Sequence, residues 1–412
     1  MSDRAAFIAA ATHEIERVLA GQALAHFRFA GNGEEIFKRF FEYISAQVPA
    51  WRDVCWRGSR VETLRPLPVL ERTVVAANPQ AFLASHKSSE RVVTKTTSGF
   101  TGAPLTVAYD LCAQYAMNTY LFANVVELLG EAWKQKSPGS TAIGLVTSKP
   151  SRDAESVLLP MLGSTIWRRF PLNDASVLNS LSVHKPAILY GKPMYIRELI
   201  DLLSGSDVSL HPSCVLTSGE RLYDDDRSAI KKIFNVGVID AFTTSECGFI
   251  AVSDLDGKEL HVQSDLVVIE VLGPDGVIAN EGSGELLITS VFNWLNPLVR
   301  YRTGDYGCVS RIENGAQLIR DIRRMAELTH LNDAGVPTTT AEAVLRPFKI
   351  WDFRLRVIAG IGFLIWSSAT LEYDLSKTVA ILLKKKMSLR GCRARRVCAV
   401  TRLGTKRMRY PQ

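Results

Sequence analysis

The sequence predicts an α/β protein: a large N-terminal domain of mostly parallel sheets covered by helices, with a β-rich subdomain, followed by a small α+β domain. Three observations support this prediction. The chain has 412 residues, which is too many for one ordinary hydrophobic core. Short apolar runs alternate with helical stretches through its middle. Its composition changes near Asp321, which divides it into domains 1–321 and 322–412.

The elements of the first domain follow from the spacing of apolar residues. We expect an amphipathic helix over residues 4–20 and a long, mostly buried helix over 111–129. Short apolar runs then predict buried strands at 142–146, 186–189, 214–216 and 236–239. Helical patterns lie between them, at 194–203 and 224–234. Strands that alternate with helices indicate a parallel sheet covered on both faces.

The pattern changes after residue 266. Apolar-rich runs at 266–272 and 285–289 are separated by glycine-rich turns, which indicates a second, more antiparallel sheet. Beyond Asp321 we expect a small α+β domain. Its predicted elements are a helix at 340–345, a hairpin at 353–370, a helix at 375–386 and a strand at 395–401.

Composition limits the class of protein. The chain is 47% hydrophobic and 22% charged, as folded proteins are. Its seven cysteines include no Cys-x-x-Cys pair, which argues against a disulfide framework and a zinc site. The N-terminus lacks a signal pattern, and the most apolar run, 357–366, is too short to span a bilayer. We therefore expect a cytoplasmic protein with no membrane partner.

The net charge is +7, and basic residues crowd the segment 384–409. Such a segment could meet nucleic acid or a phosphorylated small molecule, or could be a solvated basic face. It lacks the interleaved aromatic residues that stack bases, so nucleic acid is not an expected partner.

The segment Thr97-Ser98-Gly99-Phe100-Thr101-Gly102-Ala103-Pro104 alternates hydroxyl residues with glycines. Small residues let the backbone approach an anion, and N–H and hydroxyl groups can bond phosphate oxygens. The Gly-Lys-Ser/Thr of a P-loop is absent. The alternative is an ordinary surface turn.

Three later segments carry charged or hydroxyl groups. Phe242-Thr243-Thr244-Ser245-Glu246 follows a predicted buried strand, where a carboxylate suits a metal–phosphate site or caps a helix N-terminus. Asp305 follows Gly304, and a buried carboxylate there could accept both ribose hydroxyls; a bare Gly-Asp would be a turn. Lys406 and Arg409 lie in a basic C-terminal segment that could equally be a frayed tail.

In this order, the segments resemble the adenylate-forming superfamily of acyl- and aryl-CoA synthetases, and within it the phenylacetate–CoA ligase branch with its capsule-biosynthesis relatives. The resemblance covers nearly the whole chain. The further motifs that carry it are Leu67-Pro68-Val69-Leu70, Tyr190-Gly191-Lys192-Pro193, Ser218-Gly219-Glu220, Gly284-Glu285-Leu286 and Arg324-Met325-Ala326-Glu327.

The resemblance implies an AMP-forming acid–thiol ligase that uses ATP, Mg²⁺ and CoA. A carboxylic acid, aromatic by preference, would attack the α-phosphate of ATP, releasing pyrophosphate, and the acyl-adenylate would then pass its acyl group to CoA. Fixed donors, Mg²⁺ and a lysine would offset the repulsion between the two anions. The domain 322–412 would be mobile, rotating about a hinge near Arg324 between the two half-reactions. Many members are dimers, which leaves a homodimer open.

The resemblance also implies a role for individual residues. Lys406 would bridge the carboxylate and the α-phosphate, Glu246 would coordinate Mg²⁺ with help from Ser245, and Asp305 would bind the ribose with Arg324 beside it. The phosphate loop would act through Thr97, Ser98, Gly99, Thr101 and Gly102. The remaining nucleotide-site residues would be Ser218, Gly219, Glu220, Phe242, Thr243 and Thr244. The acid pocket would be lined by Tyr190, Ser218, Gly219 and Phe242.

The chain departs from the family pattern at Phe100, Phe242, Thr243, Arg323 and Thr405. Phe242 replaces a tyrosine, so we expect a drier pocket. No departure removes a charged group. Two other functions stay open: adenylation with transfer to a carrier-protein phosphopantetheine thiol or to an amine, and a degenerate nucleotide-binding relative. The basic tail could serve the 3′-phosphate of CoA or an acidic carrier protein.

Overall fold

The structure is a computed structural model that describes residues 33–85, 92–96, 105–130, 141–147, 156–159, 165–264, 266–313, 315–324, 352–358, 361–367 and 391–397. The chain divides into two compact units. Unit 1 consists of Met1–Gly139, Val157–Ile166 and Ile239–Ile322. Unit 2 consists of Ser140–Ser156, Trp167–Val238 and Arg323–Gln412. The division into domains 1–321 and 322–412 stays a prediction.

Unit 1 is built on strands that follow the order β12-β11-β13-β14-β15-β10-β9-β8. Their bounds are β8 Gly237–Thr244, β9 Gly248–Ser253, β10 Leu260–Val262, β11 Val267–Leu272, β12 Ile278–Ala279, β13 Gly282–Ser290, β14 Tyr301–Arg311 and β15 Gln317–Arg324. The pairs β8–β9, β9–β10, β10–β15, β11–β12, β11–β13 and β13–β14 are antiparallel. The predicted antiparallel character of this region is confirmed.

The N-terminal part of unit 1 is mostly helical. Its elements are α2 Gly33–Gln47, η1 Pro49–Trp51, α3 Arg60–Leu64, α4 Arg72–Ala77, η2 Pro79–Phe82, β1 Val92–Thr96, β2 Thr106–Asp110 and α5 Leu111–Leu129. In α2, helical spacing places Phe37, Phe40, Phe41 and Ile44 on one face, and all four are fully buried. β1 and β2 form an antiparallel hairpin.

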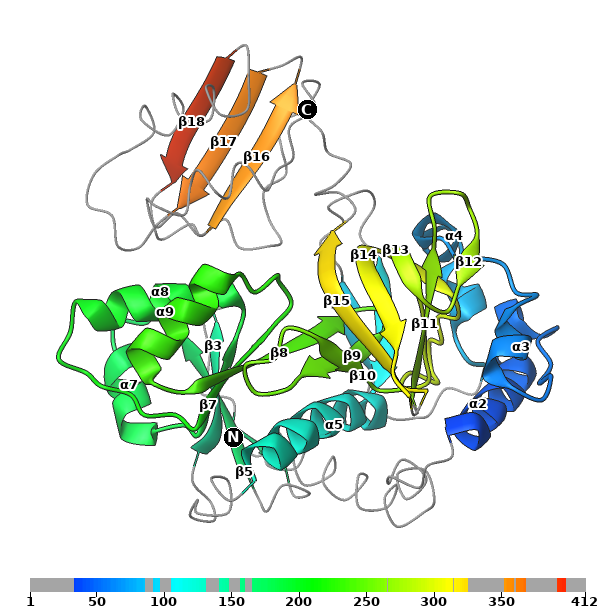
Figure 1. Ribbon diagram of the computed structural model, residues 1–412, viewed down its shortest axis with the longest axis horizontal. Coiled ribbons are helices and arrows are strands. Elements are labelled where there is room, and N and C mark those ends of the chain that lie inside the picture. Colours follow the sequence, from blue (N-terminus) through cyan, green and yellow to red (C-terminus); the bar gives the residue numbers. More distant parts are fainter. Residues whose placement is uncertain are drawn as a thin grey trace. The chain divides into compact units, whose positions relative to one another are not determined.

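The long helix α5 has the bounds that the sequence predicts. Asp110 precedes its first residue, and the Asp110 carboxylate accepts a hydrogen bond from the Ala113 backbone N–H at 2.6 Å and so caps the helix. It lies alongside β9 (Figure 1). No helix in the described ranges is both long and apolar enough to cross a membrane.

Unit 2 contains the predicted alternation of strands and helices. Its elements are β3 Thr141–Thr147, β5 Thr165–Pro171, α7 Val177–His184, β6 Ile188–Gly191, α8 Pro193–Ser204, β7 Cys214–Ser218 and α9 Asp224–Phe234. The strand β4 Ser156–Leu159 belongs to unit 1 from Val157 onward. The strand order is β7-β6-β3-β5, and β3–β6 and β6–β7 are parallel. The predicted parallel sheet is therefore confirmed.

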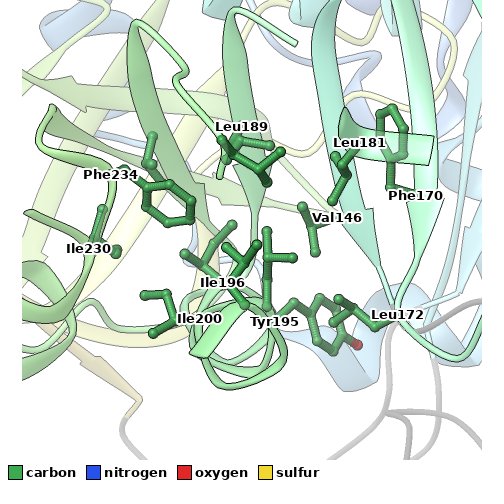
Figure 2. Packing of buried hydrophobic residues seen from close by; sticks show 14 of the residues in the cluster. Val146, Phe170, Leu172, Leu181, Leu189, Tyr195, Ile196, Ile200, Ile230 and Phe234 are labelled. Carbon is green, nitrogen blue, oxygen red and sulfur yellow. The ribbon is translucent and has the colours of Figure 1, made fainter. Parts of the chain in front are cut away.

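The core of unit 2 lies between these strands and helices (Figure 2). Ile196 and Ile200 of α8 belong to one buried cluster with Leu189 of β6, Val146 of β3 and Phe234 of α9. All five side chains are at most 6% exposed. Burying one such side chain contributes about 1.5–3 kcal/mol, so this cluster holds α8 and α9 against the strands of unit 2.

The last strands form a sheet of their own, drawn in orange and red in Figure 1. β16 Asp352–Ile358 and β17 Ile361–Ser367 are antiparallel, which confirms the predicted hairpin, and β18 Gly391–Val397 is parallel to β17. The strand expected at 395–401 begins earlier, at Gly391. The helices expected at 4–20, 340–345 and 375–386 lie outside the described residues.

Candidate active site

The turn between β8 and β9 carries Glu246. Ser245, Glu246 and Cys247 connect two antiparallel strands, so the alternative interpretation of this glutamate as part of a helix N-cap is wrong. The Thr244 hydroxyl accepts a hydrogen bond from the Cys247 backbone N–H at 2.9 Å. Gly248 ends the turn with a φ of 79°, a conformation that favours glycine.

Tyr109 of β2 is hydrogen-bonded to the backbone of this turn. Its buried hydroxyl donates to the backbone carbonyls of Ser245, at 2.7 Å, and of Glu246, at 3.1 Å. A Cβ added to Gly248 would lie 2.0 Å from the Met117 sulfur of α5, so the helix leaves room only for glycine. The turn is thus fixed by both neighbouring elements.

The carboxylate of Glu246 is already bound to a cation of the protein. Nη1 of Arg72, the first residue of α4, lies 3.2 Å from Glu246 Oε1, and the two side chains are 22% and 11% exposed. Arg72 also hydrogen-bonds the side chain of buried Tyr301. Burial, then the charges of Glu246 and Cys247, raise the pKa of Tyr301, and Arg72 opposes that rise.

The segment before Arg72 is attached to β14 through its backbone. The Leu70 N–H donates to the Arg300 carbonyl, and the Arg302 N–H donates to the Leu70 carbonyl, both at 3.0 Å. The Arg302 guanidinium then joins Glu71, at 2.8 Å, to Glu285, at 2.6 Å. Arg72 therefore reaches Glu246 from an anchored segment.

A buried ion pair secures the same segment. Arg300 and Glu270 form a two-pronged contact, with Nε–Oε2 at 2.8 Å and Nη2–Oε1 at 3.0 Å. The same guanidinium donates through Nη1 to the Leu67 carbonyl. Desolvation raises the pKa of Glu270, and Arg300 opposes this shift.

Asp305 lies inside a strand rather than in the expected turn. It belongs to β14 and is 3% exposed, and its backbone N–H donates to the Thr303 hydroxyl at 3.1 Å. A register shift opposite Glu285 and Leu287, with Gly304 at a φ of 73°, forms a bulge here. A bulge re-aims a side chain without ending the strand.

Asp305 and Glu246 both act on Cys247. Burial raises the pKa of the Cys247 thiol, and the nearby charges of Glu246 and Asp305 add to this shift. Two carboxylates that are 59 positions apart in the sequence (305 − 246) therefore act on the same buried thiol. No cluster of three or more His, Cys, Asp or Glu side chains that could hold a metal occurs within the described part of the chain.

A single carboxylate still fits a magnesium ion, because Mg²⁺ in nucleotide sites takes one or two carboxylates together with substrate phosphates and water. Glu246 is paired with a cation, so its carboxylate is charged, and a charged carboxylate is a suitable oxygen ligand for Mg²⁺. When bound, such an ion would neutralise phosphate charge.

Lys95 is a charged residue beside Tyr109 that the sequence prediction did not name as a candidate. Its ammonium lies 4.7 Å from the centre of the Tyr109 ring, and burial lowers its pKa to about 8. It stands two positions before Thr97 in β1. A lysine next to a predicted phosphate loop is a signal that could have found it. Arg72 could have been found in the same way, because it is a basic residue two positions after the Leu67–Leu70 motif.

Unit 2 places its predicted residues where two parallel strands end. The Tyr190 hydroxyl, in β6, and the Ser218 hydroxyl, at the end of β7, lie 2.8 Å apart. Burial raises the pKa of Tyr190, and Ser218 opposes that shift. Lys192 forms a 2.7 Å ion pair with Glu220. Ligands of α/β sheets bind at the carboxyl ends of strands.

The positions of the predicted residues divide into three groups. Unit 1 holds Phe242, Thr243, Thr244, Ser245, Glu246 and Asp305. Unit 2 holds Tyr190, Ser218, Gly219 and Glu220, and Arg324 is the last residue of β15. The remaining predicted residues, Thr97, Ser98, Gly99, Thr101, Gly102 and Lys406, lie outside the described residues.

Comparison with known proteins gives the class of fold. No family model matches the chain. Protein CapK from Staphylococcus aureus is 22% identical over 294 residues, which are 65% of this chain and 60% of CapK. The chain thus matches less than two thirds of the length of that relative.

Solved structures are similar over more of the chain. A 2-hydroxyisobutyryl-CoA ligase in complex with 2-HIB-AMP has a TM-score of 0.60 at 15% identity, over 91% of this chain and 87% of the enzyme. GH3.15, an acyl acid amido synthetase, has a TM-score of 0.54 at 14% identity, over 89% and 87%. A benzoate CoA ligase from Burkholderia xenovorans LB400 has a TM-score of 0.50 at 13% identity, over 85% and 76%.

These enzymes share one fold, that of the adenylate-forming acid ligases, and the chain has this fold, as the sequence predicts.

Proposed function

We propose that this protein activates a carboxylic acid with ATP to an acyl-adenylate, releasing pyrophosphate, and then transfers the acyl group to the thiol of CoA. The observation that carries the proposal is that the charges of two carboxylates, Glu246 and Asp305, both act on the buried Cys247 thiol within a fold shared with acid ligases. The complex of 2-hydroxyisobutyryl-CoA ligase with an acid adenylate supports the same chemistry here.

The proposed reaction needs separate handling of the phosphates, the ribose and the acid. Glu246, with Ser245, would hold Mg²⁺, and Asp305 would accept the ribose hydroxyls, with Arg324 beside it. The hydroxyls and glycines of the phosphate loop, Thr97, Ser98, Gly99, Thr101 and Gly102, would bind the β- and γ-phosphates. Preorganised donors of this kind stabilise developing charge without reorganising during the reaction.

The acid pocket is proposed at the carboxyl ends of β6 and β7. Tyr190, Ser218 and Gly219 would line it, with an aromatic acid as the preferred substrate, and Phe242 of unit 1 is proposed separately as an acid-binding residue. The fold likeness to a benzoate CoA ligase is consistent with such an acid. The Tyr190–Ser218 hydrogen bond, at 2.8 Å, offers two hydroxyls to a polar group of the substrate.

Lys406 is proposed to bridge the acid and the α-phosphate, as a compact cation suited to moving in and out of a site. Its place in the domain 322–412 would let a rotation near Arg324 remove it before the thiol arrives. We also place the protein in the phenylacetate–CoA ligase-like branch, in biosynthesis and in the cytoplasm. A homodimer and a carrier-protein partner belong to the same set of open proposals.

A second acceptor is supported by one comparison. The fold extends over 89% of the chain to an acyl acid amido synthetase, GH3.15, so an amine could replace the thiol in the second step. Adenylation would be the same in both cases.

The test is pyrophosphate release across benzoates, phenylacetates, cinnamates and aliphatic acids, with and without CoA. We expect one aromatic acid to give a strong signal that CoA accelerates, with the thioester as product. A signal that amines or a carrier protein accelerate, and CoA does not, would replace the acceptor. Silence with every acid in a protein that binds ATP would identify a degenerate relative.

A further inference from the structure

Arg72 contacts both the β8–β9 turn that carries Glu246 and the start of β14. Its guanidinium contacts the Glu246 carboxylate at 3.2 Å and hydrogen-bonds Tyr301, the first residue of β14. The backbone bridges of Leu70 to Arg300 and Arg302 fix the segment that carries it. The cation therefore stands next to Glu246 before any ligand arrives.

The Arg72–Glu246 contact can be replaced by another cation at Glu246. The Arg72 Nη1 to Glu246 Oε1 distance of 3.2 Å is longer than the 2.8 and 3.0 Å of the two-pronged Arg300–Glu270 pair in the same unit. The two side chains are only 22% and 11% exposed, so either charge that loses its partner needs a replacement partner. A divalent ion could displace it at Glu246, while Tyr301 would still hold the guanidinium close by.

Charge decides when that exchange is favourable. A divalent ion that binds Glu246 alone must break the ion pair and then lie beside a guanidinium, so like charges oppose it. Polyphosphate removes this repulsion, because its oxygens can bind both the divalent ion and the Arg72 guanidinium. Oxygen ligands of one octahedral Mg²⁺ lie about 3 Å apart, so a phosphate oxygen that shares the ion with Glu246 falls within reach of Arg72.

We propose that Arg72 makes divalent-metal binding at Glu246 conditional on polyphosphate: its guanidinium pairs with Glu246 when the site is empty and with a phosphate oxygen when metal and nucleotide are bound. This inference rests on the proposed function for the identity of the nucleotide. It describes a coupling free energy between two ligands, so each must strengthen the other to the same degree.

The experiment measures equilibrium binding of Mn²⁺ by its free-ion electron paramagnetic resonance signal, with and without ATP, and of ATP with and without Mn²⁺. Arg72→Gln should bind Mn²⁺ alone about fivefold tighter, because the competing cation is gone. The same variant should bind ATP at saturating Mn²⁺ about tenfold more weakly, because a charge-assisted hydrogen bond is lost.

Two further variants control the comparison. Arg39→Gln removes the same charge from an exposed i,i+4 pair with Glu35 in α2 and should leave both constants within about twofold of the wild type. Arg72→Lys keeps the charge without the planar fork, so it should retain weak Mn²⁺ binding in the absence of ATP and recover part of the ATP affinity.

Constants for Arg72→Gln that match the wild type would overturn the inference, and so would a change in only one of the two. A wild-type protein whose ATP binding ignores Mn²⁺ would also overturn it. A wild-type protein that shows the coupling but activates no acid would contradict the proposed function and leave this inference standing.

Discussion

Replacing Tyr109 with phenylalanine tests how the Glu246 turn is held. The change removes one buried hydroxyl and keeps the ring, including its contact with Lys95. That hydroxyl donates to the carbonyls of Ser245 and Glu246, at 2.7 and 3.1 Å. The perturbation is therefore confined to two hydrogen bonds under the proposed magnesium ligand.

The magnitude follows from what the carbonyls lose. A buried polar group left without its partner costs about 1–3 kcal/mol. The two carbonyls share one hydroxyl hydrogen, and the turn is only partly buried, so water can replace part of the loss. We therefore expect Tyr109→Phe to lower the free energy of unfolding by about 1–2 kcal/mol.

The assay is urea unfolding followed by tryptophan fluorescence, combined with Mn²⁺ titration in the presence of ATP. The variant should unfold at lower urea and bind Mn²⁺ several-fold more weakly, because the Glu246 backbone is less fixed. Tyr306→Phe, a partly exposed tyrosine of β14, is the matched control and should change stability by less than about 0.5 kcal/mol. Wild-type stability and metal affinity in Tyr109→Phe would refute the reasoning.

Four further outcomes are expected. Lys406→Ala should slow adenylation by orders of magnitude yet spare thioester formation from supplied acyl-adenylate; an equal fall in both half-reactions would contradict the proposed rotation. Glu246→Gln should raise the Mg²⁺ concentration needed for half-maximal pyrophosphate release and leave acid binding without ATP unchanged, as calorimetry would show. Lys95→Met should raise the free energy of unfolding by about 2 kcal/mol at pH 7, because burial lowers the lysine pKa to about 8 and the charged form opposes folding. The wild type gains stability as pH rises from 8 to 10.5, so the extra stability of the variant should fade over that range. A difference in stability that stays constant with pH would refute the assignment. Glu270→Ala should cost about 3–5 kcal/mol in urea unfolding by leaving Arg300 buried without its carboxylate, and a loss below about 1 kcal/mol would contradict that account.

Local patterns were sufficient for α5, α8, α9 and the buried strands β3, β6 and β7, but they did not indicate α2, β9 or β15. The bounds of α5 and α9 match the sequence prediction, because apolar periodicity and an N-terminal aspartate mark where α5 begins. The bulge at Gly304 was missed, since a Gly-Asp pair is compatible with either a turn or a bulge. Only the register with β13 distinguishes them.

The site was predicted in part. Glu246 and Asp305 were found because motifs mark them, but the bond from Arg72 to Glu246 joins residues 174 positions apart and follows from no local pattern. The helix-cap alternative for Glu246 failed for the same reason, because β9, which the sequence prediction did not include, pairs with β8 right after the turn. Contacts between segments that are distant in the sequence can be identified only once the fold is known.

The most direct test of the central claim follows an oxygen atom. The acid would be supplied with ¹⁸O in its carboxylate, together with ATP, Mg²⁺ and CoA, and the AMP produced would be analysed by mass spectrometry. If the carboxylate attacks the α-phosphate, the bond to carbon breaks in the second step and one ¹⁸O remains in AMP. Unlabelled AMP, or ADP in its place, would contradict activation through an acyl-adenylate.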